Sequence, residues 1–387
     1  MLDLHNSEIK VISDSIGDLV LLRDLDLSQN MNIKKLPSSI GRLLNLQALR
    51  LNHCSNLKKL PGAIKKLVNL RNLENESCYS LTRMPRGLGE LYDLKTLSEF
   101  VVSKGNGSVS KRIAKLDELQ GLGNFTGKLK IKHLRGLGGD DTAMAHLEGM
   151  QYLVSLILIW DIATTIDAVD CKKLLEDLWP HQNLKELSLS AYRGVTFSSW
   201  LPEHKNLARF SLSRCTNCIC LPPLHHLPHL EELLVDELPK LEYISDKTLE
   251  EESGVFFNSL KEIRLTNLPN LVWWWKHGAG AESPTFPSCL SKLIIKDCPN
   301  RFSMPLFPSL EGLLVLNNTR WEPFQQTIAG RQIPGTKSEA SSSTRFTDHN
   351  LSKLKTLHIV NTPKGGPNMW QSLSSLCSLA FDHVQEI

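Results

Sequence analysis

The sequence predicts an α/β solenoid, in which short parallel strands stack side by side and an irregular return segment links each strand to the next. Three observations lead to this prediction. Over residues 1–102, leucines recur with a period of 24 residues, an asparagine or cysteine recurs at one place in the unit, and a proline recurs in the returns. A period of this length is typical of solenoids, whose units bury a core only when they are stacked.

The best-defined unit begins at Leu22, and two further copies follow at intervals of 24 residues. Its positions are Leu22, Leu25, Leu27, Asn30, Ile33, Leu36, Pro37, Ile40 and Leu43, which recur as Leu46, Leu49, Leu51, Cys54, Leu57, Leu60, Pro61, Ile64 and Leu67. The third copy contains Cys78 and Pro85, and the pattern breaks at Glu99. These positions match the leucine-rich repeat consensus L-x-x-L-x-L-x-x-N/C-x-L.

Each position of the unit has a physical role. Leu49 and Leu51 are two residues apart on a strand, so both point to the same, inner side. The Asn or Cys position turns the chain, and its side chain is expected to bond backbone groups inside the bend. Pro61 lies where the return needs no N–H donor. The sequence therefore predicts a leucine-rich repeat horseshoe with a parallel sheet on its concave face.

The chain is expected to have three regions. Residues 1–102 form regular repeats, 103–128 an irregular interruption, and 129–387 irregular repeats with a mobile loop near 331–346. Helices are predicted over 140–153 and over 166–179, where Val169, Leu174, Leu175 and Leu178 would form the buried face. About thirteen to fifteen strands at roughly 4.8 Å per step would extend over about 60 to 70 Å, which suits a macromolecular partner.

Composition narrows the classes of function. The 44 Lys and Arg residues nearly balance the 41 Asp and Glu residues, for a net charge of +3. This balance gives no reason to expect a nucleic-acid partner or a membrane patch. The sequence has no 18-residue apolar window and no secretory signal at Met1, so we expect no membrane span and a location in the cytoplasm or nucleus.

The nine cysteines show no framework spacing, and we expect reduced thiols of an intracellular protein. Four of them, Cys54, Cys78, Cys215 and Cys298, fall on the turn position of a repeat. The cluster Cys215-x-x-Cys218-x-Cys220 with His225, His226 and His229 superficially resembles a zinc site. Repeat periodicity through these residues favours a structural role, so no metal is expected.

No catalytic arrangement can be identified. Gly105 leads to Ser110-Lys111-Arg112, which lacks the second glycine and the hydroxyl of a nucleotide-binding loop, and Gly127-Lys128 is followed by leucine. No Ser-His-Asp or Cys-His spacing is present. We expect no enzyme activity and no cofactor. Trp273-Trp274-Trp275 is interpreted either as a binding hot spot or as a packing plug on the convex side.

Residues 36–61 resemble the leucine-rich repeats of plant intracellular nucleotide-binding immune receptors of the coiled-coil class. Residues 212–235 match that family's C-x-x-C-x-x-LPxLGxLPxLxxL motif at Cys215, Cys218, Leu221-Pro222, Leu224, Leu227-Pro228, Leu230 and Leu233. The match departs at His225, where the family usually has glycine. Residues 94–102 and 115–134 also resemble the break between two repeat blocks in those receptors.

The resemblance implies a ligand-recognition and autoinhibitory module in plant defence. In that family the repeats recognise a pathogen effector or a guarded host protein, and they hold the nucleotide-binding domain inactive. Met1 enters mid-repeat without a polar cap, so we expect a truncated chain that retains recognition but lacks the signalling domains. The alternative is a substrate adaptor of a ubiquitin ligase, which would require an F-box at the amino terminus.

Partner binding is expected on the exposed strand residues that alternate with the leucines. In the first block these are Ala48, Arg50, Asn52, Asn72, Glu74 and Glu76. In the second block they are Glu186, Ser188, Arg209, Ser211, Glu232, Leu234, Arg264, Thr266, Lys292, Ile294 and His358. Their charges are mixed in sign, so no charged partner is favoured.

Overall fold

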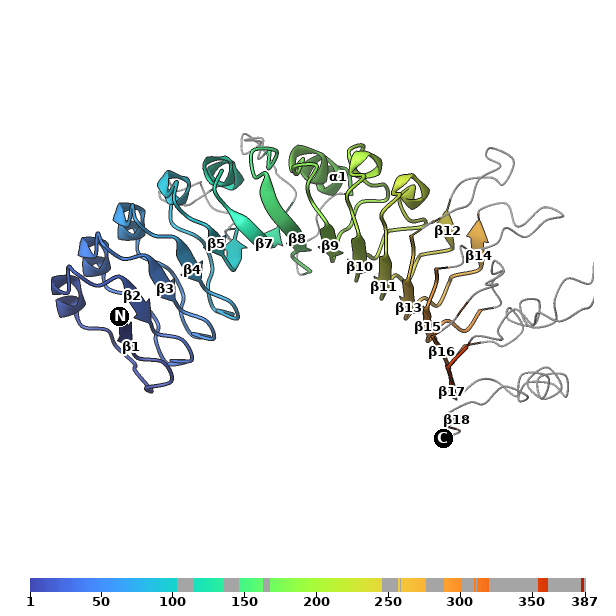
Figure 1. The fold of residues 1–387 in the computed structure, drawn as a ribbon, viewed down its shortest axis with the longest axis horizontal. Coiled ribbons are helices and arrows are strands. Elements are labelled where there is room, and N and C mark those ends of the chain that lie inside the picture. The colour runs from blue at the N-terminus through green and yellow to red at the C-terminus, as the bar shows by residue number, and fades with distance from the viewer. Residues whose placement is uncertain are drawn as a thin grey trace, which may run out of the picture. The chain divides into compact units, whose positions relative to one another are not determined.

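The protein is a leucine-rich repeat solenoid with long parallel sheets, which confirms the predicted fold class (Figure 1). Its computed structural model describes residues 1–102, 115–135, 146–162, 168–245, 257, 259–275, 289–300, 310, 312–319, 354–360 and 384–385. The chain forms two compact units, Met1–Trp200 and Leu201–Ile387. The loop predicted near 331–346 lies outside the described residues.

The described part of the first unit contains nine strands. They are β1 (Leu2–Asp3), β2 (Asp24–Asp26), β3 (Ala48–Arg50), β4 (Asn72–Glu74), β5 (Thr96–Leu97), β6 (Glu99–Val101), β7 (Thr126–Leu134), β8 (Tyr152–Trp160) and β9 (Glu186–Ser190). Strands β1 to β5 pair in chain order in one sheet, and β6 to β9 pair in chain order in a second one. Every pairing is parallel, because each return brings the chain back to the same side.

Short 3-10 helices lie on the return side of the first unit, away from the strands (Figure 1). They are η1 (Asp14–Asp18), η2 (Ser38–Arg42), η3 (Gly62–Lys66), η4 (Leu88–Glu90) and η5 (Leu116–Gly121), and one longer helix follows, α1 (Ala168–Asp177). Residues 115–128 thus hold η5 and the start of β7. The region boundaries at 102 and 128 remain a prediction.

The second unit repeats this organisation. Its strands are β10 (Arg209–Ser213), β11 (Glu232–Asp236), β12 (Tyr243–Ser245), β13 (Glu262–Thr266), β14 (Trp273–Trp275), β15 (Lys292–Lys296), β16 (Leu313–Asn317), β17 (Thr356–Val360) and β18 (Val384–Gln385). Most of these strands follow one another in a single parallel sheet, called the main sheet here: β10, β11, β13, β15, β16, β17 and β18. The remaining two, β12 and β14, pair with each other in a separate ladder. The short helices η6 (Leu201–Glu203) and η7 (Leu224–His226) belong to its returns.

The 24-residue period appears directly as strand register. Leu25 pairs with Leu49, and Leu49 pairs with Leu73, so equivalent leucines are stacked on neighbouring strands. All three are fully buried, as are Leu57, Ile64 and Leu67 of the return. The core of these repeats therefore lies between the strands and the return segments, as predicted.

The turns after β2, β3 and β4 each depend on one residue with a left-handed backbone. Gln29, His53 and Ser77 occupy this position with φ near 60°, directly before Asn30, Cys54 and Cys78. The Asn30 amide donates to the carbonyl oxygens of Leu4 and Leu27, and its oxygen accepts from two backbone N–H groups. These bonds compensate the buried polar groups of the bend.

The cysteines at the turn position bond the neighbouring repeat. The Cys54 thiol donates to the Leu27 carbonyl at 3.2 Å, and the Cys78 thiol donates to the Leu51 carbonyl at 3.1 Å. Both side chains are buried. The predicted turn role of these cysteines is confirmed.

The repeat pattern breaks at Glu99 because the set of inward-pointing residues shifts there by one position. Leu97 is buried on β5, and the next inward residue is Phe100 on β6, which pairs with Ile131. The odd spacing turns Glu99 to the side that carries Lys130 and Lys132. Because side chains alternate along a strand, this shift of one residue separates the two sheets at Ser98.

Two helix predictions have different outcomes. The helix over 166–179 is confirmed as α1, but its buried face consists of Cys171, Leu174, Leu175 and Leu178. Val169 is 71% exposed, so its place on that face was wrong, because it does not share the i, i+3, i+4, i+7 spacing.

The helix over 140–153 was wrong in its described part. Residues 140–145 lie outside the described ranges. Leu147 forms a parallel bridge with Pro180, and β8 already begins at Tyr152. Strand pairing with neighbouring repeats therefore overrides the local preference for a helix.

Candidate functional site

The exposed strand face is the set of side chains that alternate with the buried leucines of the strands. Of the seventeen residues predicted there, fifteen are fully or partly exposed. Ala48 and Ile294 are buried, with 4% and 8% of their surface exposed. Ala48 is short and lies between the longer Asp24 and Asn72 of the adjacent strands, and Ile294 lies between Arg264 and Val315.

In the first unit, charged residues of this face pair across neighbouring strands. Arg50 lies between two carboxylates, with Nη1 at 2.6 Å from Asp24 and Nε at 3.3 Å from Glu74. The Asn52 amide donates to the second oxygen of Glu74 at 2.8 Å. Opposite charges on adjacent strands stabilise the sheet, so these residues have a structural role as well as an exposed surface.

The second unit shows the same arrangement. Arg209 donates two hydrogen bonds to Glu232, at 2.6 and 2.7 Å. These bonds lower the pKa of the Glu232 carboxyl, more than its partial burial raises it. Glu262 accepts from Arg264 at 2.9 Å and forms an ion pair with Lys292 at 3.0 Å. Ser211 and His358 are partly exposed on the same face, as is Ser188 of the first unit.

A buried carboxylate on this face was not predicted from sequence. Glu99 is only 2% exposed, and its two oxygens contact Lys130 at 3.1 Å and Lys132 at 3.0 Å. Lys130 also reaches Glu76 at 3.4 Å. Burial lowers the pKa of Lys130, but the bonds and attraction of Glu99 and Glu76 outweigh it, so the pKa lies above its ordinary value. The sequence signal for this carboxylate was that Glu99 occupies the repeat position of Leu27 and Leu51.

The cysteine and histidine cluster of the second unit is part of a repeat. Cys215 and Cys218 are buried, and the Cys215 thiol donates to the Ser213 carbonyl at 3.4 Å. The hydrogen bond with Cys215 and burial raise the pKa of the Cys218 thiol far above its usual range. Within the described ranges, no group of three or more His, Cys, Asp or Glu side chains could hold a metal ion.

The tryptophan triplet forms β14, which lies outside the main sheet and pairs with β12. The Trp274 side chain is fully buried. For Trp274 this favours the packing interpretation, because a hot-spot side chain must be reachable by a partner.

Among the described helices, none combines the length and apolar character that a bilayer-crossing segment needs.

Comparisons with known proteins agree with this geometry. Residues 116–238 match the family described as R13L1/DRL21 LRRs. The chain is 32% identical over 307 residues to disease resistance RPP13-like protein 1 of Arabidopsis thaliana, and 36% identical over 232 residues to disease resistance protein RGA4 of Solanum bulbocastanum. The matches cover 74% and 58% of this chain.

Over its repeats, the chain is homologous to plant disease resistance proteins. The predicted relationship is thereby confirmed. The matched regions span 28% and 22% of the two relatives, so the chain covers less than a third of the length of either relative.

A solved structure agrees in fold alone. The chain in the crystal structure of a TLR13–ssRNA13 complex is 17% identical, with a TM-score of 0.50 over 96% of this chain and 54% of that one. At this identity the likeness extends to the leucine-rich repeat architecture and no further.

Proposed function

We propose that the chain recognises a protein ligand through its exposed strand face, as the recognition and autoinhibitory module of a plant innate immune receptor. The ligand class is a pathogen effector or a host protein that an effector modifies, and the location is the cytoplasm or nucleus. One observation carries the proposal: a polar strand face, exposed in both units, belongs to repeats homologous to disease resistance proteins.

The composition of the face supports a protein partner. Its charges are largely neutralised by neighbours, as in Arg50 with Asp24 and Glu74 and in Arg209 with Glu232. Such a surface does not attract one sign of charge, so binding requires shape and hydrogen-bond complementarity. The proposed module has no catalytic role of its own and needs no cofactor.

The test measures binding of the full chain to a panel of purified pathogen effectors and of host proteins that those effectors modify. Ser188→Arg and Ser211→Arg each place a bulky cation on the face. We expect either variant to abolish binding of a panel member that binds the parent chain. Val169→Arg on α1 is the matched control, because Val169 is exposed on the return side. Binding that tolerates both serine variants contradicts the proposal.

Autoinhibition needs a separate measurement. The chain is expressed together with the part of the RPP13-like protein that remains when its repeats are removed. We expect cell-death signalling by that part to decrease when the chain is present. Unchanged signalling, with the chain present at equal level, contradicts the autoinhibitory role and leaves the recognition role to its own test.

A further inference from the structure

A groove on the return side of the first unit carries a concentration of positive charge. It has a volume of about 1210 Å³ and runs along the segments before and within η1 to η4. Eight cationic side chains and two carboxylates line it, a balance of +6. The whole chain carries only +3, so the rest of the protein is slightly negative.

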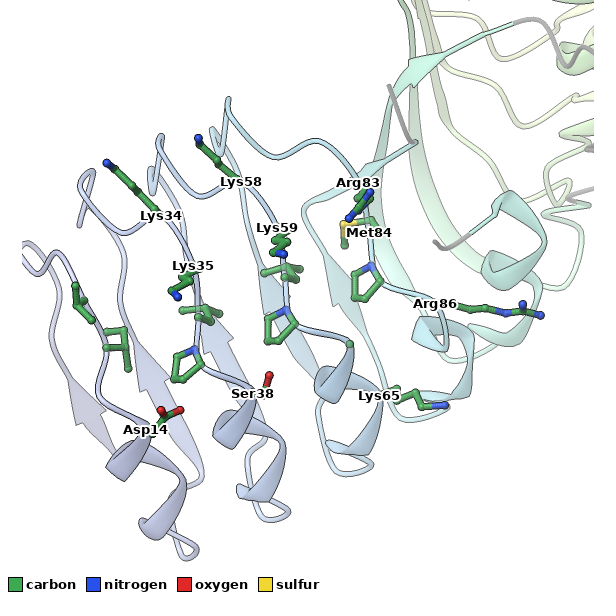
Figure 2. A pocket seen from close by; sticks show the side chains of 18 of the residues that line it. Asp14, Lys34, Lys35, Ser38, Lys58, Lys59, Lys65, Arg83, Met84 and Arg86 are labelled. Carbon is green, nitrogen blue, oxygen red and sulfur yellow. The ribbon is translucent and has the colours of Figure 1, made fainter. Parts of the chain in front are cut away.

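The cations form rows that follow the repeat. Figure 2 shows Lys34 and Lys58 at equivalent positions of successive repeats, with Lys35, Lys59 and Arg83 as a second row. Lys35 and Lys59 are directly paired in a parallel β-bridge between neighbouring repeats. Neighbouring strands lie about 4.8 Å apart, so like charges are repeated at close range along the groove.

These cations differ from those on the exposed strand face. There, Arg50 lies between Asp24 and Glu74. In the groove, six exposed side chains form no ion pair with any described residue: Lys10, Lys34, Lys35, Lys58, Lys59 and Arg83. Like charges on adjacent strands are destabilising. The same repeats therefore neutralise their charges on the exposed strand face and leave positive charge uncompensated in the groove.

We infer that this groove binds a soluble ligand that carries several phosphate groups. The ammonium groups are compact point charges that suit phosphate oxygens. Two observations weigh against other polyanions. Protein interfaces are depleted in lysine at their centre, whereas six of the residues that line this groove are lysines. Binding of single-stranded nucleic acid relies on aromatic stacking, and none of the described lining residues is aromatic.

Calorimetry on the full chain tests the inference, with sodium tripolyphosphate and myo-inositol hexakisphosphate as probes. We expect saturable binding that weakens with salt. The double variant Lys35→Gln, Lys59→Gln removes two charge-assisted bonds and should weaken binding on the order of tenfold or more. The double variant Lys35→Arg, Lys59→Arg should bind within a few-fold of the parent.

The matched control is Lys172→Gln, Lys173→Gln on α1, which removes the same charge from exposed positions outside the groove. It should bind like the parent. Thermal unfolding separates a ligand site from a structural role, because the groove glutamine variant should be as stable as the parent or more stable once the repulsion is removed.

Three results would overturn the inference. The first is absence of binding by either soluble probe, and the second is equal weakening by the α1 control. The third is tighter binding of poly-glutamate, of single-stranded RNA, or of vesicles with phosphatidylinositol 4,5-bisphosphate than of the soluble probes. The groove variants leave the exposed strand face intact, so failure here is distinct from failure of the recognition proposal.

Discussion

At the scale of single residues, the turn position combines two needs that few side chains meet. The residue must fit a buried bend and also offer a donor to a backbone carbonyl. Asn30 meets both with an amide, and Cys54 and Cys78 meet both with a small thiol. A free cysteine packs as a small apolar side chain, so a buried thiol is tolerated there.

The buried thiols predict a pH dependence of stability. Burial, the largest cause, raises the pKa of Cys54 from 9.0 to about 11 and the pKa of Cys78 to about 12. Because the folded pKa is raised, the stabilisation is full below pH 9 and is lost as pH rises through 11 to 12. Each pKa unit corresponds to about 1.4 kcal/mol, so the expected loss is on the order of a few kcal/mol.

Urea unfolding between pH 8 and 12 measures this loss. The variant Cys54→Ala, Cys78→Ala should be less stable at pH 8 but should lose less further stability on the way to pH 12. Cys289→Ala, at a half-buried position of the second unit, should keep the slope of the parent chain. Equal slopes for all three proteins would contradict the assignment to Cys54 and Cys78.

At the scale of elements, the returns are held by contacts between successive repeats. Glu118 of η5 shows this most clearly. Its carboxylate accepts from the backbone N–H groups of Gly87, Leu88 and Gly89, at 2.9, 2.6 and 3.2 Å. These bonds satisfy the N-terminus of η4 from the next return in the chain.

The close approach of η4 and η5 also requires glycine. A Cβ on Gly121 would lie 2.3 Å from the Gly89 carbonyl oxygen, and a Cβ on Gly89 would lie 2.3 Å from the Glu118 carbonyl oxygen. Residues 115–121 therefore stack closely on η4 of the preceding repeat.

We expect Glu118→Ala to lower the free energy of unfolding by roughly 1 to 3 kcal/mol, because three backbone donors lose their acceptor. Asp117→Ala is the control, since Asp117 is adjacent but exposed and should change stability by less than about 0.5 kcal/mol. Denaturant unfolding measures both. Equal effects of the two substitutions would show that Glu118 does not hold η4.

At the scale of the whole molecule, each repeat contacts chiefly its neighbours, and stability is nearly one-dimensional. Leu49 is fully buried and is stacked between Leu25 and Leu73. Removing its side chain should leave a cavity that costs about 3 kcal/mol in the first unit.

Hydrogen exchange tests how far this damage spreads. Leu49→Ala should accelerate backbone exchange in β2, β3 and β4, and it should leave β11 and β13 of the second unit unchanged. Leu233→Ala, a fully buried leucine on β11, should give the reverse pattern. Faster exchange through both units in either variant would contradict local stabilisation.

The sequence by itself determined the fold class, the core leucines, the turn cysteines and the exposed strand face. Each of these follows from spacing within one 24-residue unit, which the chain repeats without reference to distant parts. The resemblance to plant immune receptors was likewise readable, because LPxL and C-x-x-C motifs lie within single repeats.

Only the tertiary structure decided what depends on neighbouring repeats. Ala48 and Ile294 are buried between side chains of adjacent strands, and Val169 is exposed although it lies on an amphipathic helix. Glu99 finds Lys130 and Lys132 across a strand pair. The basic groove arises from lysines 24 residues apart, which become close neighbours only once the repeats are stacked.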